Sequence, residues 1–380
     1  MKSIFLIILT TFLLYSCEVH LGEDDINSEL DIPLDNLNDV VITRDNGLLI
    51  SGEYDSKITV IKTDPNFLTY WRRDDFEWGN LMRGDWGSMS YWISILNSYQ
   101  TDEGNYCLTG MITEGGCVIS HSILVIGLDK RGSELINTRF DQLYVVDAIK
   151  TDDGGQLLYG TKLIKLNRFI DVTWEKDYDP WTIKVINTRD GNYAMVFRRD
   201  GKESLLRVLD RNGNEILSAG FCFNELFWDE VAYDLVQLSD NGFFIVGRSE
   251  NYEGSSPHLD CAVIRLRPDG TEVWKTRFGS DDNDEWLDNI LYTNDQYAII
   301  QGSIGFPNAS YRRSTVFKID YNGQVLDSCS FNPGTYLLYN QKGYFIKAEK
   351  TTEGLYHFNK IPLDAIFDHW LKLKGQQSIY

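Results

Sequence analysis

The sequence lacks the features that mark most membrane-spanning proteins and many enzymes. No apolar run reaches the roughly 20 residues that a transmembrane helix needs. There is no HExxH, GxSxG, Walker or GxGxxG motif, and the five histidines have no metal-ligand spacing. These absences remove the common signatures of zinc proteases, α/β-hydrolases and nucleotide-dependent enzymes. We therefore expect no catalytic residues and no enzymatic activity.

Basic residues are also scarce. Lys and Arg number 36 against 56 Asp and Glu, so the formal net charge is −20. A nucleic-acid-binding protein needs the opposite sign to meet the phosphate backbone, so DNA and RNA are not expected partners. The same acidity argues against direct adhesion to anionic lipid headgroups. It is compatible with cations, neutral glycans or basic protein surfaces.

Cysteines are few and do not suggest a disulfide framework. The chain has six, and the five that follow Cys17 cannot all pair. None of them forms a CxxC arrangement, and most lie inside apolar strand-like runs. Buried free thiols are the expected state.

The N-terminal segment predicts export. Lys2 precedes an almost wholly apolar stretch, residues 4–14, which is too short to span a bilayer and is typical of a signal peptide. The sequence Leu14-Tyr15-Ser16-Cys17 follows it and resembles the lipobox of bacterial lipoproteins. That resemblance implies cleavage after residue 16 and lipidation of Cys17, although Tyr15 replaces the small residue usual there. The alternative is ordinary secretion with an unmodified Cys17.

Residues 17–36 are expected to form the lipidated cysteine and a flexible tether. The segment from Glu18 to Asn36 is acidic and poor in aromatic residues, so it cannot bury enough apolar surface to fold. An acidic stretch behind a lipidated cysteine resembles the surface-export signal of lipoproteins in Bacteroides-type bacteria. The resemblance implies a lipid anchor in the outer membrane, with the protein on the cell surface or on the periplasmic side.

The rest of the chain contains a sevenfold internal repeat. A polar turn, usually containing Asp and Gly, precedes a short apolar strand seven times, and several repeats continue through a second turn of the same kind. Hydrophobic content of 43% and the absence of a sustained helical period favour a globular all-β protein. We predict a single β-propeller of seven four-stranded blades over residues 37–374, with residues 375–380 as a C-terminal tail. Eight blades would require strands from residues 26–36 or from the tail.

The repeat has a recognisable pattern. Residues 240–247 carry Asp-Asn-Gly before an apolar strand and a Gly, and residues 263–274 carry an apolar strand, a Gly turn and a Trp. This pattern resembles the propeller repeats of secreted lipoproteins from Bacteroides-type bacteria. Its second half is also similar to quinoprotein-like propellers, including outer-membrane assembly lipoproteins. The resemblance implies the fold and leaves the function open.

One face of such a propeller is expected to bind ligands. The turns that carry Asp and Gly are short, whereas the loops expected on the opposite face vary widely in length, and variable loops on a rigid scaffold commonly carry binding sites. Aromatic and arginine side chains suit sugar stacking or a protein hot spot. The candidate ligand-binding residues are Trp78, Arg83, Trp86, Trp92, Trp228 and Trp286. Alternatively, these tryptophans simply wedge between blades.

Four aspartates share one spacing from their turns. Asp39, Asp147, Asp234 and Asp288 each lie eight residues before the turn positions 47, 155, 242 and 296. On innermost strands, four carboxylates at one register would ring the channel mouth and could hold a cation, with Ca²⁺ as the possible cofactor. The alternative is that each aspartate binds loop amides and fixes its own blade.

These observations predict a cell-envelope lipoprotein that binds a protein or a glycan without catalysis, through the loop-rich face. One alternative is a scaffold lipoprotein for outer-membrane assembly. Another is a glycan-active lyase or hydrolase that uses acidic residues at the channel mouth.

Overall fold

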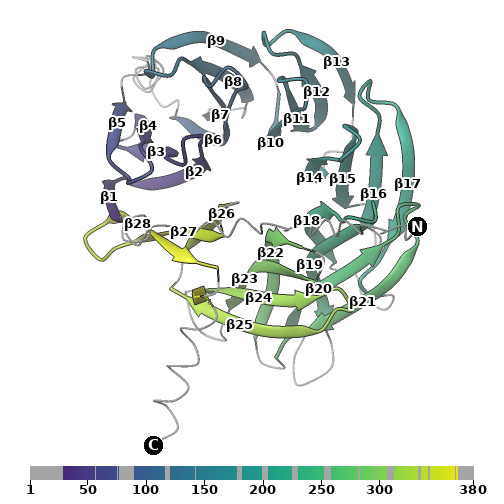
Figure 1. Ribbon diagram of the computed structural model, residues 1–380. Coiled ribbons are helices and arrows are strands. Elements are labelled where there is room, and N and C mark those ends of the chain that lie inside the picture. The colour runs from purple at the N-terminus through teal and green to yellow at the C-terminus, as the bar shows by residue number, and fades with distance from the viewer. Residues whose placement is uncertain are drawn as a thin grey trace, which may run out of the picture.

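The computed structural model describes residues 29–366 except 56, 75, 77–89, 116–119, 142, 178–181, 199–203, 225–229, 252–257, 281–282, 295, 306–311, 333–334, 341–342 and 364. The described strands form seven four-stranded antiparallel sheets, arranged as the blades of a ring (Figure 1). The predicted all-β, seven-bladed propeller is therefore confirmed.

The blades follow the chain from the ring axis outward. Blade one consists of β2 (Asn36–Ile42), β3 (Leu48–Tyr54), β4 (Lys57–Thr63) and β5 (Thr69–Arg73). Blade two consists of β6 (Ser90–Gln100), β7 (Tyr106–Gly115), β8 (Ser120–Leu128) and β9 (Glu134–Asp141). Blade three consists of β10 (Val145–Lys150), β11 (Gln156–Gly160), β12 (Lys162–Leu166) and β13 (Val172–Asp177). Blade four consists of β14 (Thr182–Asn187), β15 (Tyr193–Arg198), β16 (Ser204–Leu209) and β17 (Glu215–Phe221).

The same order continues to the end of the ring. Blade five consists of β18 (Val231–Gln237), β19 (Phe243–Asn251), β20 (His258–Leu266) and β21 (Glu272–Phe278). Blade six consists of β22 (Asp284–Thr293), β23 (Tyr297–Gly305), β24 (Arg312–Asp320) and β25 (Val325–Phe331). Blade seven consists of β26 (Tyr336–Asn340), β27 (Tyr344–Lys350), β28 (Leu355–Pro362) and β1 (Glu29–Pro33).

The seventh blade corrects the boundary expected for the tether. Residues 29–33 form β1, which pairs antiparallel with β28 as the outermost strand of blade seven. In Figure 1 the start and the end of the described chain therefore meet in one sheet. The side chains of Ile32 and Leu34 are buried against blades seven and one. The segment was misread because its few apolar residues are diluted by acidic ones, although their burial closes the ring.

The predicted turns lie together on one face, which we call the turn face. Gly47, Gly104, Gly155, Gly242 and Gly343 all fall between the first and second strands of their blades. Because the innermost strands of a propeller run in the same direction, these turns emerge on the same side of the ring. The opposite side, which carries the connections from second to third strands and between blades, is the loop face.

The apolar core consists of layers between neighbouring blades. Second strands are buried on both faces, as in β3, β11 and β15, because a blade packs against a neighbour on each side. Each large cluster of buried apolar side chains joins two adjacent blades around the ring. No helix in the described part of the chain is long and apolar enough to cross a membrane.

The blades alternate in chemistry around the ring. In blades one to five, one register position of the outermost strand holds, in order, Trp71, Ile136, Trp174, Leu217 and Trp274. The residue opposite on the third strand alternates as well, being a cation in the odd blades: Lys62, Lys165 and Arg265. Each cation pairs with the first-turn aspartate of its own blade, Asp45, Asp153 or Asp240, at 2.7–2.9 Å.

The odd-blade tryptophans seal the interfaces to the following even blades. The indole Nε1 atoms of Trp71, Trp174 and Trp274 donate to the carbonyl oxygens of Lys130, Arg211 and Tyr321, in the second turn of the next blade, at 2.8–3.0 Å. Gly213 in one of these turns has a φ of 76°, and a Cβ there would lie 3.2 Å from the Trp174 ring. Glycine therefore supplies both the turn conformation and the room for the indole. Blades one and two, three and four, and five and six form three sealed pairs.

Candidate functional site

A central cavity of about 730 Å³ opens around the ring axis. The innermost strands of all seven blades contribute to its wall, which makes it a product of the whole ring. The polar side chains that line it include three amides on the innermost strands, two serines of blade six and the tyrosines of β26. They are Asn38, Asn97, Asn289, Ser303, Ser314, Tyr336 and Tyr339.

All four predicted aspartates line this cavity. The expectation that the sequence spacing would bring Asp39, Asp147, Asp234 and Asp288 to one region near the axis is therefore correct. Lys184 of β14 lines the same wall, and its charge lowers the pKa of both Asp147 and Asp234 against the larger effect of burial, which raises it. The cavity thus carries its own cation between two of its carboxylates.

Two of the aspartates bind the neighbouring blade through its backbone. Asp39 Oδ2 accepts a hydrogen bond from the Ser98 amide of β6 at 2.6 Å. Asp234 Oδ2 accepts one from the Ile290 amide of β22 at 2.7 Å, and its Oδ1 accepts from its own neighbour Leu235. These bonds tie blade one to blade two and blade five to blade six, at the innermost strand.

Asp147 makes the third such connection through a tyrosine. The Tyr159 hydroxyl donates to Asp147 Oδ2 at 3.0 Å, and the backbone of Val185 in blade four also hydrogen-bonds to that hydroxyl. The Asp147 Oδ1 atom accepts from the amide of Ala148 at 2.7 Å. Blades one, three and five therefore each use an aspartate at this position to hold the following even blade.

Asp288 does not share the register of the other three. Asp39, Asp147 and Asp234 stand directly after the irregularity in their strands, opposite Ser51, Tyr159 and Val246. In β22 that position belongs to Asn289, because a second irregularity between Ile290 and Tyr292 adds a residue before the turn. Asp288 instead accepts a hydrogen bond from Ser303 Oγ at 2.9 Å. The register predicted for Asp288 was wrong because a count of residues back from the turn does not allow for the extra bulge in β22.

The geometry does not support the predicted calcium site. In the part of the chain that the structure describes, no three His, Cys, Asp or Glu side chains lie close enough to hold a metal ion together. The physical reason is that the carboxylates are already engaged with backbone amides and hydroxyls, and Lys184 supplies positive charge. The alternative, in which each aspartate binds loop amides and fixes its own blade, is met only in part: Asp147 and Asp288 bind hydroxyls of their own blades, whereas Asp39 and Asp234 bind strand amides of the next blade.

Burial sets the protonation of the cavity wall. It raises the pKa of Asp39 to about 6, in spite of the hydrogen bond from Ser98, which favours the charged form. The pKa values of Asp147 and Asp234 are also raised, mainly by burial. The negative charge that the cavity presents to a ligand therefore grows as the pH rises through the weakly acidic range.

The predicted aromatic candidates are only partly placed. Trp78, Arg83, Trp86 and Trp228 lie outside the described residues. Trp92 belongs to β6, where it pairs with Thr113 of β7, and its side chain is not described. Trp286 of β22 is 7% exposed and therefore offers little surface on which a sugar could stack.

A second group of buried acids lies at the loop face between blades five and six. Asp260 and Glu285 both approach Gly279, where an added Cβ would lie 2.4 Å from Asp260 Oδ1 and 3.1 Å from Glu285 Oε2. His258 Nε2 lies 3.5 Å from Asp260 Oδ1. Burial, followed by the charge of Asp260, raises the pKa of Glu285. Sequence reasoning missed this group because its members lie on three separate segments between residues 258 and 285 and follow no motif.

Lys184 was missed for a related reason. It occupies the innermost-strand position that holds aspartate in blades one, three and five. In the other two even blades, two and six, the residues at this position are Asn97 and Asn289. The signal that could have revealed this alternation is the recurrence of Trp71, Trp174 and Trp274 in every second repeat. Read as a two-blade repeat, the sequence predicts different residues at this position in odd and even blades.

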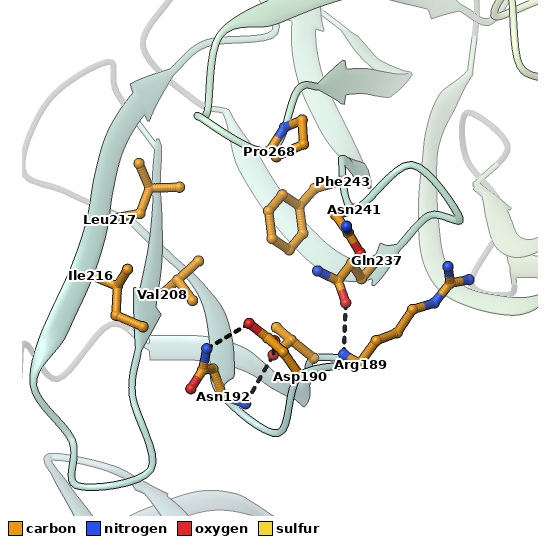
Figure 2. A pocket seen from close by; sticks show the side chains of 11 residues that line it. Arg189, Asp190, Asn192, Val208, Ile216, Leu217, Gln237, Asn241, Phe243 and Pro268 are labelled. Carbon is orange, nitrogen blue, oxygen red and sulfur yellow. Dashed lines mark hydrogen bonds between the residues drawn. The ribbon is translucent and has the colours of Figure 1, made fainter.

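Two grooves open on the turn face where the tryptophan seal is missing. One lies between blades four and five, has a volume of about 350 Å³ and is shown in Figure 2, where Val208, Leu217 and Phe243 surround the space. Its rim is held by a hydrogen bond from the Arg189 amide to Gln237 Oε1 at 2.8 Å. The other, of about 400 Å³, lies at the equivalent place between blades two and three. Ile136 and Leu217 stand where odd blades have tryptophan.

Comparison with solved structures shows the fold and no closer relationship. The chain is similar to the Neurospora crassa Pan2 WD40 domain, with a TM-score of 0.51 and 12% identity over 86% of this chain and 89% of that one. It also matches prolyl oligopeptidase B from Galerina marginata, with a TM-score of 0.50 and 13% identity, over 90% of this chain. It spans about half of that enzyme, 49% of its length.

A protein of unknown function from Bacteroides caccae matches over 64% of this chain and 81% of that one, with 13% identity and a TM-score of 0.36. No protein-family model matches the sequence, and no curated protein does so either. At these identities the matches establish the β-propeller fold alone and give no family assignment.

Proposed function

We propose that this protein is a lipid-anchored lipoprotein of the cell envelope that binds a protein or a glycan without catalysis, with the central cavity as its principal site. The observation that carries the proposal is the cavity itself: about 730 Å³, on the ring axis, with polar side chains from several blades converging on it. Binding pockets in proteins have volumes of about 300–1,000 Å³ and a few convergent polar groups. The volume of this cavity falls within that range, and its lining is richer in polar groups.

The lining favours a ligand that donates hydrogen bonds. Four aspartates and one lysine are the charged residues of the described wall, and the amides and hydroxyls around them both donate and accept. Sugar hydroxyls can donate to these carboxylates, and so can the lysine or arginine side chains of a protein partner. An anionic ligand would meet a surplus of negative charge.

The site can be tested by closing the cavity with a large side chain. Asn38 lines the wall from β2, so Asn38→Trp should obstruct the cavity and weaken binding at least about tenfold, which corresponds to roughly 1.4 kcal/mol. The matched control is Asn322→Trp, in an exposed second turn on the turn face. The full-length lipoprotein in detergent would be assayed against a glycan array and against envelope proteins by photo-crosslinking. Binding that survives Asn38→Trp but not Asn322→Trp would contradict the proposal.

The anchor has a separate test. Cys17→Ala should abolish labelling of the protein by a fatty-acid analogue and leave the precursor uncleaved, because the lipobox-like sequence requires its cysteine. Ser16→Ala is the control that keeps the cysteine and a small residue before it. A Cys17→Ala precursor that is still cleaved after residue 16 and sorted as before would show ordinary secretion.

A further inference from the structure

The groove between blades two and three differs from its sister groove in the polarity of its floor. Its wall includes an apolar surface formed by the side chains of Tyr106, Leu135, Ile136, Phe169 and Ile170, and Thr101, Asn105 and Asn167 line it as well. Leu135 and Phe169 stand at its rim and are 55% and 63% exposed. Exposed apolar groups around a concave surface indicate a place where another apolar group is received.

Gln156 supplies a polar group at the floor. It begins β11, is 1% exposed and lines the groove. Its Oε1 atom accepts a hydrogen bond from Thr109 Oγ1 at 2.7 Å, whereas its Nε2 atom has no hydrogen-bond partner among the described residues. A buried amide without a partner is destabilising, because its N–H has lost water without gaining another acceptor. An acceptor atom of a ligand in the groove would remove that cost.

The charge around the groove is balanced. Among its described lining residues, Glu103 and Arg168 are the charged ones, and both are exposed at the rim. The Arg168 guanidinium lies 4.7 Å from the centre of the Phe169 ring, on which it stacks. One anion and one cation at the entrance favour neither sign of ligand. Neutral donors such as the Gln156 amide and the Thr101 hydroxyl also cannot compensate the desolvation of an ionised group.

We propose that this groove is a binding site for an uncharged, mainly apolar small molecule that carries one hydrogen-bond acceptor, such as a ketone or amide carbonyl. The apolar body packs against Ile136 and Ile170, and the carbonyl oxygen accepts from Gln156 Nε2. The site is separate from the central cavity, because it lies on the turn face at the outer part of the ring.

The sister groove provides the internal contrast. Phe243 of β19 occupies the position that Gln156 has in β11, each being the first residue of the second strand. Figure 2 shows the Phe243 ring facing the space between blades four and five. That groove therefore offers no donor from this position, and its apolar floor should not distinguish a carbonyl compound from a hydrocarbon.

The experiment compares three probes of the same shape. They are 4-phenylbutan-2-one, which has the acceptor, butylbenzene, which lacks it, and 3-phenylpropanoate, which is charged. Binding to the full-length protein would be measured by saturation-transfer NMR titration. We expect the ketone to bind at least about tenfold more tightly than either of the other two probes, because only the ketone satisfies the buried amide without bringing a charge.

Two variants test whether the ketone binds in the groove between blades two and three. Gln156→Leu should remove the preference of the protein for the ketone over butylbenzene. Ile136→Trp should fill the groove as Trp174 fills the interface of blades three and four, and should abolish binding of the ketone. Leu217→Trp fills the sister groove instead and should leave the affinity for the ketone unchanged.

The proposal remains testable if a tryptophan variant does not fold, because Gln156→Leu removes the hydrogen bond from Gln156 to the ketone without adding a large side chain. Equal affinity of wild-type protein for the ketone and butylbenzene would overturn the proposal. So would ketone binding that is unaffected by both Gln156→Leu and a folded Ile136→Trp, or the absence of binding at millimolar concentrations. None of these results bears on glycan or protein binding in the central cavity.

Discussion

Single residues hold neighbouring blades of this propeller together. At the outer edge, Trp174 donates its indole N–H to Arg211 and packs on Gly213 and Tyr193, all in the next blade. At the axis, Asp39 and Asp234 each bind a backbone amide of the next blade. Both kinds of contact run from an odd blade to the even blade that follows it. Loss of one such side chain should weaken one interface without altering the strands.

Trp174→Ala should therefore lower the free energy of unfolding by about 3 kcal/mol. The value is near the low end of the range for buried aromatic residues, because part of the indole remains accessible. Urea unfolding followed by circular dichroism measures the change. Val172→Ala, two residues earlier on the same strand and 47% exposed, should change the free energy by less than about 0.5 kcal/mol. Similar losses in the two variants would show that the indole does not seal the interface.

Asp39 gives a prediction about pH. Its pKa in the folded protein is raised to about 6, above the ordinary value of 3.8, so the folded state binds more protons than the unfolded state between pH 4 and 6. Stability contributed by the protonated carboxyl is complete below pH 4 and is lost as the pH rises through 6. In Asp39→Asn the new amide oxygen can still accept the hydrogen bond from Ser98, and the side chain does not titrate. The variant should therefore not lose stability as the pH rises through 6.

The stability of Asp39→Asn relative to wild type should therefore increase by about 2–3 kcal/mol between pH 4 and pH 7. Urea unfolding at intervals across that range measures the difference. Asp152→Asn, at an exposed position in a first turn, serves as the control for removal of a charge. A difference between Asp39→Asn and wild type that stays constant with pH would contradict the raised pKa.

At the scale of elements, the short strand β1 has an effect out of proportion to its length. It contributes five residues, yet its Ile32 side chain enters the cluster that joins blades seven and one. The strand also covers the edge of β28, which would otherwise expose unpaired backbone groups. The ring is closed by pairing residues from opposite ends of the described chain.

Ile32→Ala should destabilise the protein by about 2–4 kcal/mol, the range typical of a buried isoleucine truncated to alanine. Because β1 pairs only with β28, we expect the amides of β28 to lose protection from hydrogen exchange first. Glu29→Ala, at the exposed start of the same strand, should leave exchange unchanged. Exchange that increases equally in all blades would show that β1 does not act as a local closure.

The elements also show where sequence reasoning was accurate. The turn residues predicted the hairpins correctly, because a tight turn needs particular residues within a few positions and its signal is local. The register of Asp288 was wrong because the bulges in β22 leave no such signal in the sequence. β1 was read as tether for a similar reason, since the identity of its pairing partner depends on β28, more than 300 residues away.

At the scale of the whole molecule, the ring consists of three sealed blade pairs and a seventh blade that closes it. Interfaces within the pairs carry the tryptophan seal and the axial aspartate contacts. Those between blades two and three and between blades four and five instead contain grooves. The pairs should therefore behave as cooperative units during partial unfolding.

Native-state hydrogen exchange at increasing denaturant tests this arrangement. The amides of blades three and four, residues 145–221, should converge on one opening free energy that differs from that of blade two. In Trp174→Ala, blades three and four should separate into two opening units. A common unit formed by blades two and three in the wild-type protein would contradict the proposed pairing.

The amino-acid sequence alone predicts the strands and the number of repeats, because hairpin turns and apolar strands are encoded within short stretches. It also predicted that Asp39, Asp147, Asp234 and Asp288 would gather near the axis, since a repeated spacing becomes a shared radius in a ring. What those carboxylates bind depends on how the blades are placed around the axis. Their partners are Ser98, Tyr159, Ile290 and Ser303, and Lys184 reaches the cavity from blade four. The grooves, the ring closure and the blade pairing are likewise tertiary, because each depends on which blades meet and which side chain fills the space between them.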